Sequence, residues 1–411
     1  MATMRSGEGQ VSGASEMRDG WRILAGCFVG VSASFASLFF YTSGIFLKPV
    51  AETFGWTRGE ISLSSIAVLV GNVLAFPVAG RLVDRFGERR VAFLSTLGLG
   101  LSFCLLAVLT TGLWIYLILL TLLCCLSSGG NLIPYNRLLT QHFCRLRGLA
   151  FGIALGGTSF GAAILPVYLA PYVAEHGWRA GYLLLGGLTV PLALLTFWLI
   201  GRPAADTVMS PRDAGLHWSE VVRHRAFRSI GTIVFLAAAA VLGTTLHVIA
   251  MLTDKGMTAA EAGALASGLG VAVLAGRVGA GYLLDRWDAG VVTAVLLALV
   301  ATGMGALATG RPEMILPAIL LVGLGVGTEG DILAYLLGRR FPVRNFGTVY
   351  GTILSVHAFG AGLGGFVAGA LFDLFGSYQA WLSCAAAMLL VAASIAWLTE
   401  RSVRPLAASV A

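Results

Sequence analysis

The stretch Gly80–Arg90, with the sequence GRLVDRFGERR, places six charged side chains among eleven residues. The preceding residues 66–79 are apolar apart from Asn72, and another apolar run follows. A weaker copy, GYLLDRWD, occupies Gly281–Asp288, 201 residues later. Charge confined to short segments between long apolar runs is typical of loops that join membrane-spanning helices. This stretch therefore points to a membrane fold.

The composition supports that interpretation. Hydrophobic residues make up 57% of the 411 residues and charged residues only 11%, whereas soluble domains average about 25% charged residues. Apolar runs of roughly 20 residues match the hydrocarbon core of a bilayer, which is about 30 Å thick. The 54 glycines allow close packing of transmembrane helices. We expect a polytopic membrane protein.

The apolar runs predict an all-α integral membrane protein with twelve transmembrane helices in two pseudo-symmetric six-helix halves. The expected segments are an N-terminal cytoplasmic tail at 1–21, an N-terminal six-helix bundle at 22–199, a central cytoplasmic loop with an amphipathic helix at 200–228, a C-terminal six-helix bundle at 229–398 and a C-terminal cytoplasmic tail at 399–411.

The orientation follows from the placement of lysine and arginine. Of the 27 basic residues, 21 fall in the tails and loops of one face and five in the loops of the other. Cytoplasmic loops carry such an excess, so we expect both termini in the cytoplasm and a multi-pass protein of the inner (plasma) membrane.

The two halves repeat in register. Asp84 and Asp285 are 201 residues apart, and Gly148 and Gly347 are 199 apart. Parallel repeats of this kind place a solute site near the bilayer midplane between the halves, which rock around it.

The opening stretch and its copy predict a cytoplasmic gate. An aspartate at the end of one helix can approach the N-terminus of a neighbouring helix, where the helix dipole favours negative charge. The arginines are expected to meet lipid phosphate or carboxylates of the opposing half. The gate residues are Gly80, Asp84, Arg85, Gly87, Arg89, Arg90, Gly281, Asp285 and Arg286.

The same stretch resembles the helix 2–3 signature of the major facilitator superfamily, with Glu88 where a basic residue is more usual. A narrower resemblance, to the monocarboxylate transporter and oxalate:formate antiporter group, rests on three segments. These are FCRLRGLAFGIALGGTSFGAAILP at 143–166, RDGWRIL at 18–24 and LHVIAMLTDKGMT at 246–258. The first resemblance implies a transporter fold over nearly the whole chain, and the second implies a carboxylate substrate.

Arg277 is the sharpest candidate for substrate binding. It lies eight residues before Asp285, which is about 12 Å along a helix, near the bilayer middle. An arginine at that depth requires a wet cavity or a partner, and its planar fork suits a carboxylate. The resemblance implies that it anchors the anionic substrate. The alternative is a structural ion pair with an internal acid.

Glu329 and Asp331 are the candidate internal acids, about 15 and 12 Å from Arg339 along the same helix. Because they are two residues apart, they point to nearly opposite faces of a regular helix, unless the glycines of GLGVGTEGD break it. Either could carry a coupled proton, and either could simply neutralise Arg277.

Four further residues are candidates, each with a packing alternative. His247 and Tyr41 are expected in the outer part of the site, and Asn131 near mid-membrane. His357 is a second candidate proton carrier, because histidine titrates near neutral pH. The expected helix 346–372 contains no lysine, unlike the oxalate antiporter that it resembles, which makes a doubly anchored dicarboxylate less favoured.

These observations predict a secondary active transporter of a small organic anion, most favourably a monocarboxylate, coupled to protons by alternating access. The alternatives are an exporter of drugs or other small solutes by proton antiport, and a porter of inorganic anions or other nutrients. We expect no enzyme activity, metal or cofactor, and a monomer that meets the bilayer, its substrate and protons but no nucleic acid. The sequence is compatible with symport and with antiport.

Overall fold

The computed structural model of the chain describes residues 13–201, 218–257 and 259–400, and in these residues all regular structure is helical. Eleven helical segments are long and apolar enough to cross a membrane. One of them, α7 (Arg147–Ile200), has non-helical backbone at Gly177, with φ 84° and ψ 164°, and therefore makes two spans. The predicted twelve-helix fold is confirmed.

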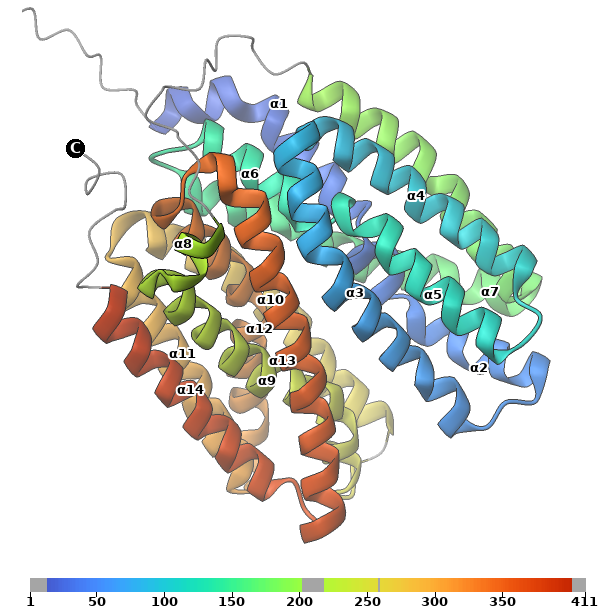
Figure 1. Cartoon of the computed structure of the whole chain (residues 1–411). Coiled ribbons are helices and arrows are strands. Elements are labelled where there is room, and N and C mark those ends of the chain that lie inside the picture. Colours follow the sequence, from blue (N-terminus) through green and yellow to red (C-terminus); the bar gives the residue numbers. More distant parts are fainter. Residues whose placement is uncertain (1–12, 202–217, 258, 401–411) are drawn as a thin grey trace, which may run out of the picture.

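The helices of the first half (blue to green in Figure 1) have two interruptions, and the first helix begins at Gly13, within the segment expected to be a tail. They are α1 (Gly13–Ser32), η1 (Ala36–Phe40), α2 (Ser43–Phe54), α3 (Arg58–Phe86), α4 (Glu88–Leu109), α5 (Leu113–Ser127), η2 (Ser128–Gly130), α6 (Leu132–His142) and α7.

The second half (yellow-green to red in Figure 1) has uninterrupted spans. Its helices are α8 (Trp218–Arg223), α9 (Arg225–Thr253), α10 (Ala259–Arg286), α11 (Ala289–Ala308), α12 (Pro312–Arg340), η4 (Val343–Asn345), α13 (Phe346–Phe375) and α14 (Gln379–Glu400). Parts of three expected segments, 1–12 of the N-terminal tail, 202–217 of the central loop and 401–411 of the C-terminal tail, lie outside the described residues.

The two interruptions occur where short polar and small residues gather. In the first span, a π-helical turn follows Ser34 and ends at Tyr41, and the hydroxyl of Thr42 donates to the carbonyl of Leu38 at 2.6 Å. In the fourth span, a 3₁₀ turn at Ser128–Gly130 leads to Asn131, whose backbone is extended. The corresponding stretch of α12 stays helical through GLGVGTEGD. Its glycines therefore do not break the helix.

The two halves meet most closely at one end of the bundle, which we call the gate end. It is the end at which α3 and α10 finish and α7 and α13 begin. Gly80 faces Gly347 there, and Gly148 faces Gly281. A methyl group on any of the four would collide with the backbone carbonyl of the opposing glycine, so these positions need glycine for helix-to-helix contact.

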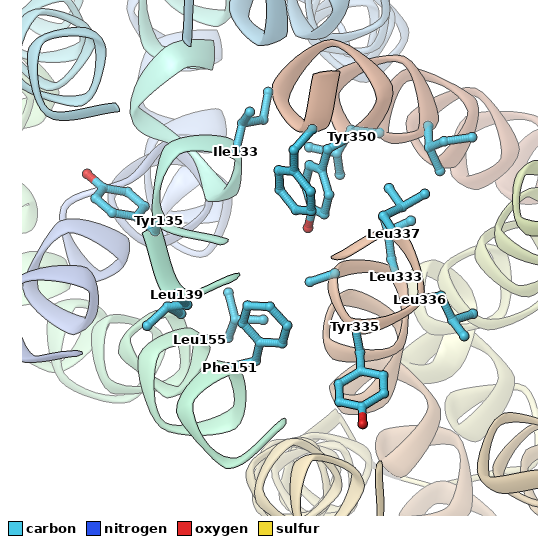
Figure 2. Close-up of a cluster of buried hydrophobic side chains, with 14 of the residues drawn as sticks. Ile133, Tyr135, Leu139, Phe151, Leu155, Leu333, Tyr335, Leu336, Leu337 and Tyr350 are labelled. Carbon is cyan, nitrogen blue, oxygen red and sulfur yellow. The ribbon is translucent and has the colours of Figure 1, made fainter. Parts of the chain in front are cut away.

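Beside the glycine pairs the two halves share an apolar cluster. One buried cluster draws on both halves, whereas two others lie within a single half each. Figure 2 shows the shared cluster, in which Ile133, Leu139, Phe151 and Leu155 of the first half lie opposite Leu333, Leu337 and Tyr350 of the second.

Contact between the halves continues along α3 and α13 as far as Leu69 and Gly362. Part of the way along, the hydroxyl of Ser355 donates to the carbonyl of Val73 at 2.8 Å. Beyond this level α3 and α13 diverge, as Figure 1 shows towards the bottom of the view. The structure is therefore closed at the gate end.

We predict that Gly347→Val prevents this closure, because the backbone at Gly80 cannot yield to a larger side chain. Overpacking costs about 1–3 kcal/mol, which lowers the stability of the closed state and raises the ratio of open to closed molecules about fivefold or more. A single cysteine introduced at Leu333 should therefore react with a label added from the gate side about fivefold faster or more. Gly187→Val is the matched control, since Gly187 is exposed and has no neighbouring heavy atom within 4 Å of an added methyl group. Equal labelling of the two variants would contradict the prediction.

Candidate functional site

Two aspartates hold the gate end together across the halves. Asp84 on α3 accepts hydrogen bonds from the backbone N–H groups of Gly347 (2.9 Å) and Thr348 (2.7 Å) and from the Thr348 hydroxyl (2.6 Å). These groups lie in the first turn of α13. A carboxylate there satisfies free N–H groups and interacts with the positive end of the helix dipole.

The second aspartate repeats the arrangement. Asp285 on α10 accepts hydrogen bonds from the N–H groups of Gly148 at 2.6 Å and Leu149 at 2.9 Å, which lie in the first turn of α7. The sequence predicted this role for both aspartates. Within the first half, Glu16 of α1 accepts from the N–H groups of Cys144 (2.5 Å) and Leu146 (2.9 Å), just before α7. Sequence reasoning missed Glu16, which stands in a segment expected to be a tail.

A buried arginine supports the first aspartate. Arg137 on α6 lies 3.5 Å from Asp84 and 3.1 Å from Glu88, and donates to the carbonyl of Val83 at 2.9 Å. Gln141 donates to Glu88 at 2.9 Å. The sequence pattern did not single out Arg137, which lies inside α6. The pairing also explains why an acid occupies position 88.

The other charges of the gate motif have local contacts. The guanidinium of Arg85 lies 5.2 Å from the ring of Phe86, that of Arg89 3.5 Å from the ring of Phe197, and that of Arg286 4.1 Å from the ring of Tyr282. Arg85, Arg90 and Arg286 are exposed. Gly87 alone joins α3 to α4, with φ 84°.

Arg277 and Asp331 form a buried pair between the halves. The Arg277 side chain is 10% exposed and that of Asp331 is 0% exposed, and the nearest atoms of the two are 4.0 Å apart. Arg277 lies on the interface, because a methyl group on Gly152 of α7 would come within 2.7 Å of its backbone carbonyl. Alongside, a methyl group on Gly330 would lie 4.0 Å from Arg277 Nη1 and 3.7 Å from Leu155 of the other half.

This pair is poorly satisfied. Within the described part of the chain, Arg277 Nε and both carboxylate oxygens of Asp331 have no hydrogen-bond partner. Buried polar atoms are nearly always partnered, and leaving such charges unpaired is costly. The arrangement therefore favours a place for water or a ligand between the halves.

Glu329 points away from this pair. Its Oε2 lies 3.1 Å from Nε2 of His357 on α13. The two acids of α12 thus address different partners, as their spacing predicted.

The remaining candidates are placed as follows. Asn131 is buried, and its side-chain oxygen has no partner in the described residues. Tyr41 is 37% exposed and packs edge-on against Phe40. His247 contacts the carbonyl of Gly365 at 3.0 Å and the hydroxyl of Tyr378 at 3.3 Å, all within the second half.

One cross-half contact was not anticipated. Asn136 on α6 donates to the hydroxyl of Tyr350 on α13 at 2.7 Å, with both side chains buried. Figure 2 shows Tyr350 directed into the interface. The two residues are 214 positions apart, so no local pattern joins them, although a polar residue within an apolar span is a detectable signal.

The two helical bundles thus meet around buried charges at the gate end. The sequence pattern of the Major Facilitator Superfamily matches residues 29–364 and, in a second match, 228–410. The chain belongs to this superfamily. It is therefore a multi-pass membrane transporter and not an enzyme.

Known proteins resemble the chain over most of its length. Mouse monocarboxylate transporter 11 is 26% identical over 397 residues, covering 90% of this chain and 85% of the relative. The riboflavin transporter MCH5 of Saccharomyces cerevisiae is 23% identical, covering 86% and 72%. The Escherichia coli fucose:proton symporter has a similar structure, with a TM-score of 0.73 at 17% identity, covering 93% and 98%.

We predict that Asp84→Asn and Asp285→Asn each shift the protein towards opening at the gate end. Losing the charge at a helix N-terminus removes about 1–2 kcal/mol of stabilisation from the closed state. The ratio of closed to open molecules then falls about 5- to 30-fold. Distances between spin labels at the exposed positions Arg90 and Arg344 would report the two populations by double electron–electron resonance.

Glu52→Gln is the control for this experiment. Glu52 pairs with Lys48 at 3.7 Å, and both side chains are largely exposed, so the pair contributes little. An unchanged distance distribution in both aspartate variants would contradict the role assigned to the two aspartates.

Proposed function

We propose that the chain is a secondary active transporter of a small organic anion, most favourably a monocarboxylate, driven by coupled protons. The observation that carries this proposal is the buried, incompletely bonded Arg277 at the interface between the halves. A carboxylate supplies the two coplanar acceptors that a guanidinium binds best.

The neighbourhood of Arg277 supports a small ligand. Gly330 has no side chain, and a methyl group there would lie in contact distance of both Arg277 Nη1 and Leu155 of the other half. A ligand there touches both halves. Its carboxylate would bind Arg277, which makes no direct hydrogen bond to Asp331 at 4.0 Å, and its apolar part would meet Leu155.

Alternating access would then proceed by exchange of the gate contacts. With the gate end closed, as here, substrate would enter from the opposite side. Opening the gate end would separate Asp84 from α13 and Asp285 from α7, and release substrate there. We assign the gate end to the cytoplasm, because the basic residues concentrate in its loops. The domain boundaries, the inner-membrane location and the monomeric state given above belong to the same proposal.

Two other proposals concern the remaining candidates. Asn131 offers a free carbonyl oxygen that suits a hydroxyl or amide of the substrate, and Tyr41 and His247 would lie along the entry path. Asp331, Glu329 and His357 are the groups proposed to carry the proton. The relatives named as monocarboxylate transporters support a carboxylate substrate, and Arg277 favours it over the riboflavin that the yeast relative is named for.

Uptake into proteoliposomes tests the proposal. A labelled panel of lactate, pyruvate, acetate, formate, oxalate and an aromatic acid is offered under an inward proton gradient. We expect uptake of at least one monocarboxylate. Arg277→Gln should lower kcat/KM about 10- to 100-fold, because a hydrogen bond to a charged group contributes about 1.5–3 kcal/mol. Arg277→Lys should be intermediate, since it keeps the charge but loses the fork.

Arg311→Gln is the control, because Arg311 is exposed in a loop at the opposite end from the gate. Insertion and monodispersity are checked for every variant. If Arg277→Gln transports a carboxylate as well as the wild type does, Arg277 is structural and the proposed binding role fails.

A further inference from the structure

A second pair of titratable groups lies inside the C-terminal half. His357 Nε2 and Glu329 Oε2 are 3.1 Å apart, and the side chains are 25% and 9% exposed. The pair joins α12 to α13. It is separate from Arg277 and Asp331, because the adjacent acids of α12 point to opposite faces of that helix.

The pair lines a small cavity between α9, α11, α12 and α13. Its volume of about 20 Å³ is enough for one water molecule. Two buried oxygens at the cavity, Glu329 Oε1 and Thr293 Oγ1, have no hydrogen-bond partner among the described residues. A water molecule between them would satisfy both.

Apart from the pair itself, the lining carries no charged or titratable group. α9 contributes Ile233, Val234 and Ala237, α11 contributes Thr293 and Leu297, and α12 adds Thr328 and Ile332. A change of one proton on Glu329 and His357 therefore changes the charge of the cavity without local compensation.

Electrostatics links this cavity to the substrate site. Arg277 and Asp331 are together neutral, so an incoming carboxylate adds one negative charge to a buried region. An ionised Glu329 beside a neutral His357 adds another. Uptake of one proton by the pair leaves an ionised Glu329 beside a protonated His357, which is neutral, and offsets the repulsion.

We propose that Glu329 and His357, with a water molecule bridging to Thr293, form the proton-binding site that couples transport of the carboxylate. This inference rests on the proposed function. The imidazole takes one proton from a hydronium ion of the outer solution, which becomes water, and returns it to water on the other side. Because α13 also supplies the N–H groups that bind Asp84, the charge state of the pair acts on a helix that forms the gate.

Two measurements on Glu329→Gln and His357→Gln test the assignment. In one-to-one symport, a gradient of one pH unit drives about tenfold accumulation. The wild type should reach that value, and both variants should fall to about onefold while retaining exchange of labelled for unlabelled substrate at equal pH. Glu175→Gln is the matched control, because Glu175 and His176 form an exposed pair at 3.9 Å.

The second measurement needs no substrate. Infrared difference spectra of the wild type across pH 5 to 8 should show an imidazole signal that disappears in His357→Gln, changes in Glu329→Gln and stays unchanged in Glu175→Gln. If the signal persists in both variants, or if both accumulate substrate as the wild type does, the assignment is wrong. If the folded variants lose both exchange and accumulation, the assignment is also wrong. A titration signal in a protein that moves no carboxylate would refute the proposed function while leaving the proton site standing.

Discussion

A charge buried within a membrane protein must be neutralised by the protein itself, because the surrounding lipid offers no water and no counterion. The gate end meets this requirement by joining the halves. Asp84 and Asp285 each bind the free N–H groups of a helix from the other half, and Arg137 lies between Asp84 and Glu88. Contact between the halves and satisfaction of the two aspartates therefore go together in this structure, and the glycine pairs allow the helices to approach closely enough.

The same requirement is only partly met further along the interface. Arg277 and Asp331 are 4.0 Å apart, with three polar atoms unsatisfied among the described residues. A complete set of bonds needs a partner that the described residues do not provide there. In the account given above, a carboxylate completes the set, and a proton on Glu329 and His357 offsets its charge. Substrate binding and gating then share one physical basis, which is the pairing of charges across helices.

Much of the fold followed from the sequence. Apolar runs of membrane length and the repeated charged turn predicted the helices, the pseudo-symmetry and the contacts of Asp84 and Asp285 with the N-termini of neighbouring helices. The two-residue spacing of Glu329 and Asp331 was enough to place them on different faces. The contacts that the sequence did not indicate are tertiary: Arg137 pairs with Asp84 and Glu88, which come from two other helices. The contact of Asn136 with Tyr350 joins residues 214 apart, and nothing local in the sequence indicates it.

If the buried positive charge of Arg277 selects a carboxylate, the melting temperature of the purified wild type depends on the charge of the added ligand. Each acid of a panel is compared with its own amide, which has the same shape without the charge. Because a ligand at 100 times its Kd stabilises a protein by about 2.7 kcal/mol, we expect a higher Tm with at least one monocarboxylate and no shift with the matching amide. An equal shift with both, or a shift with cations or neutral solutes alone, would contradict it.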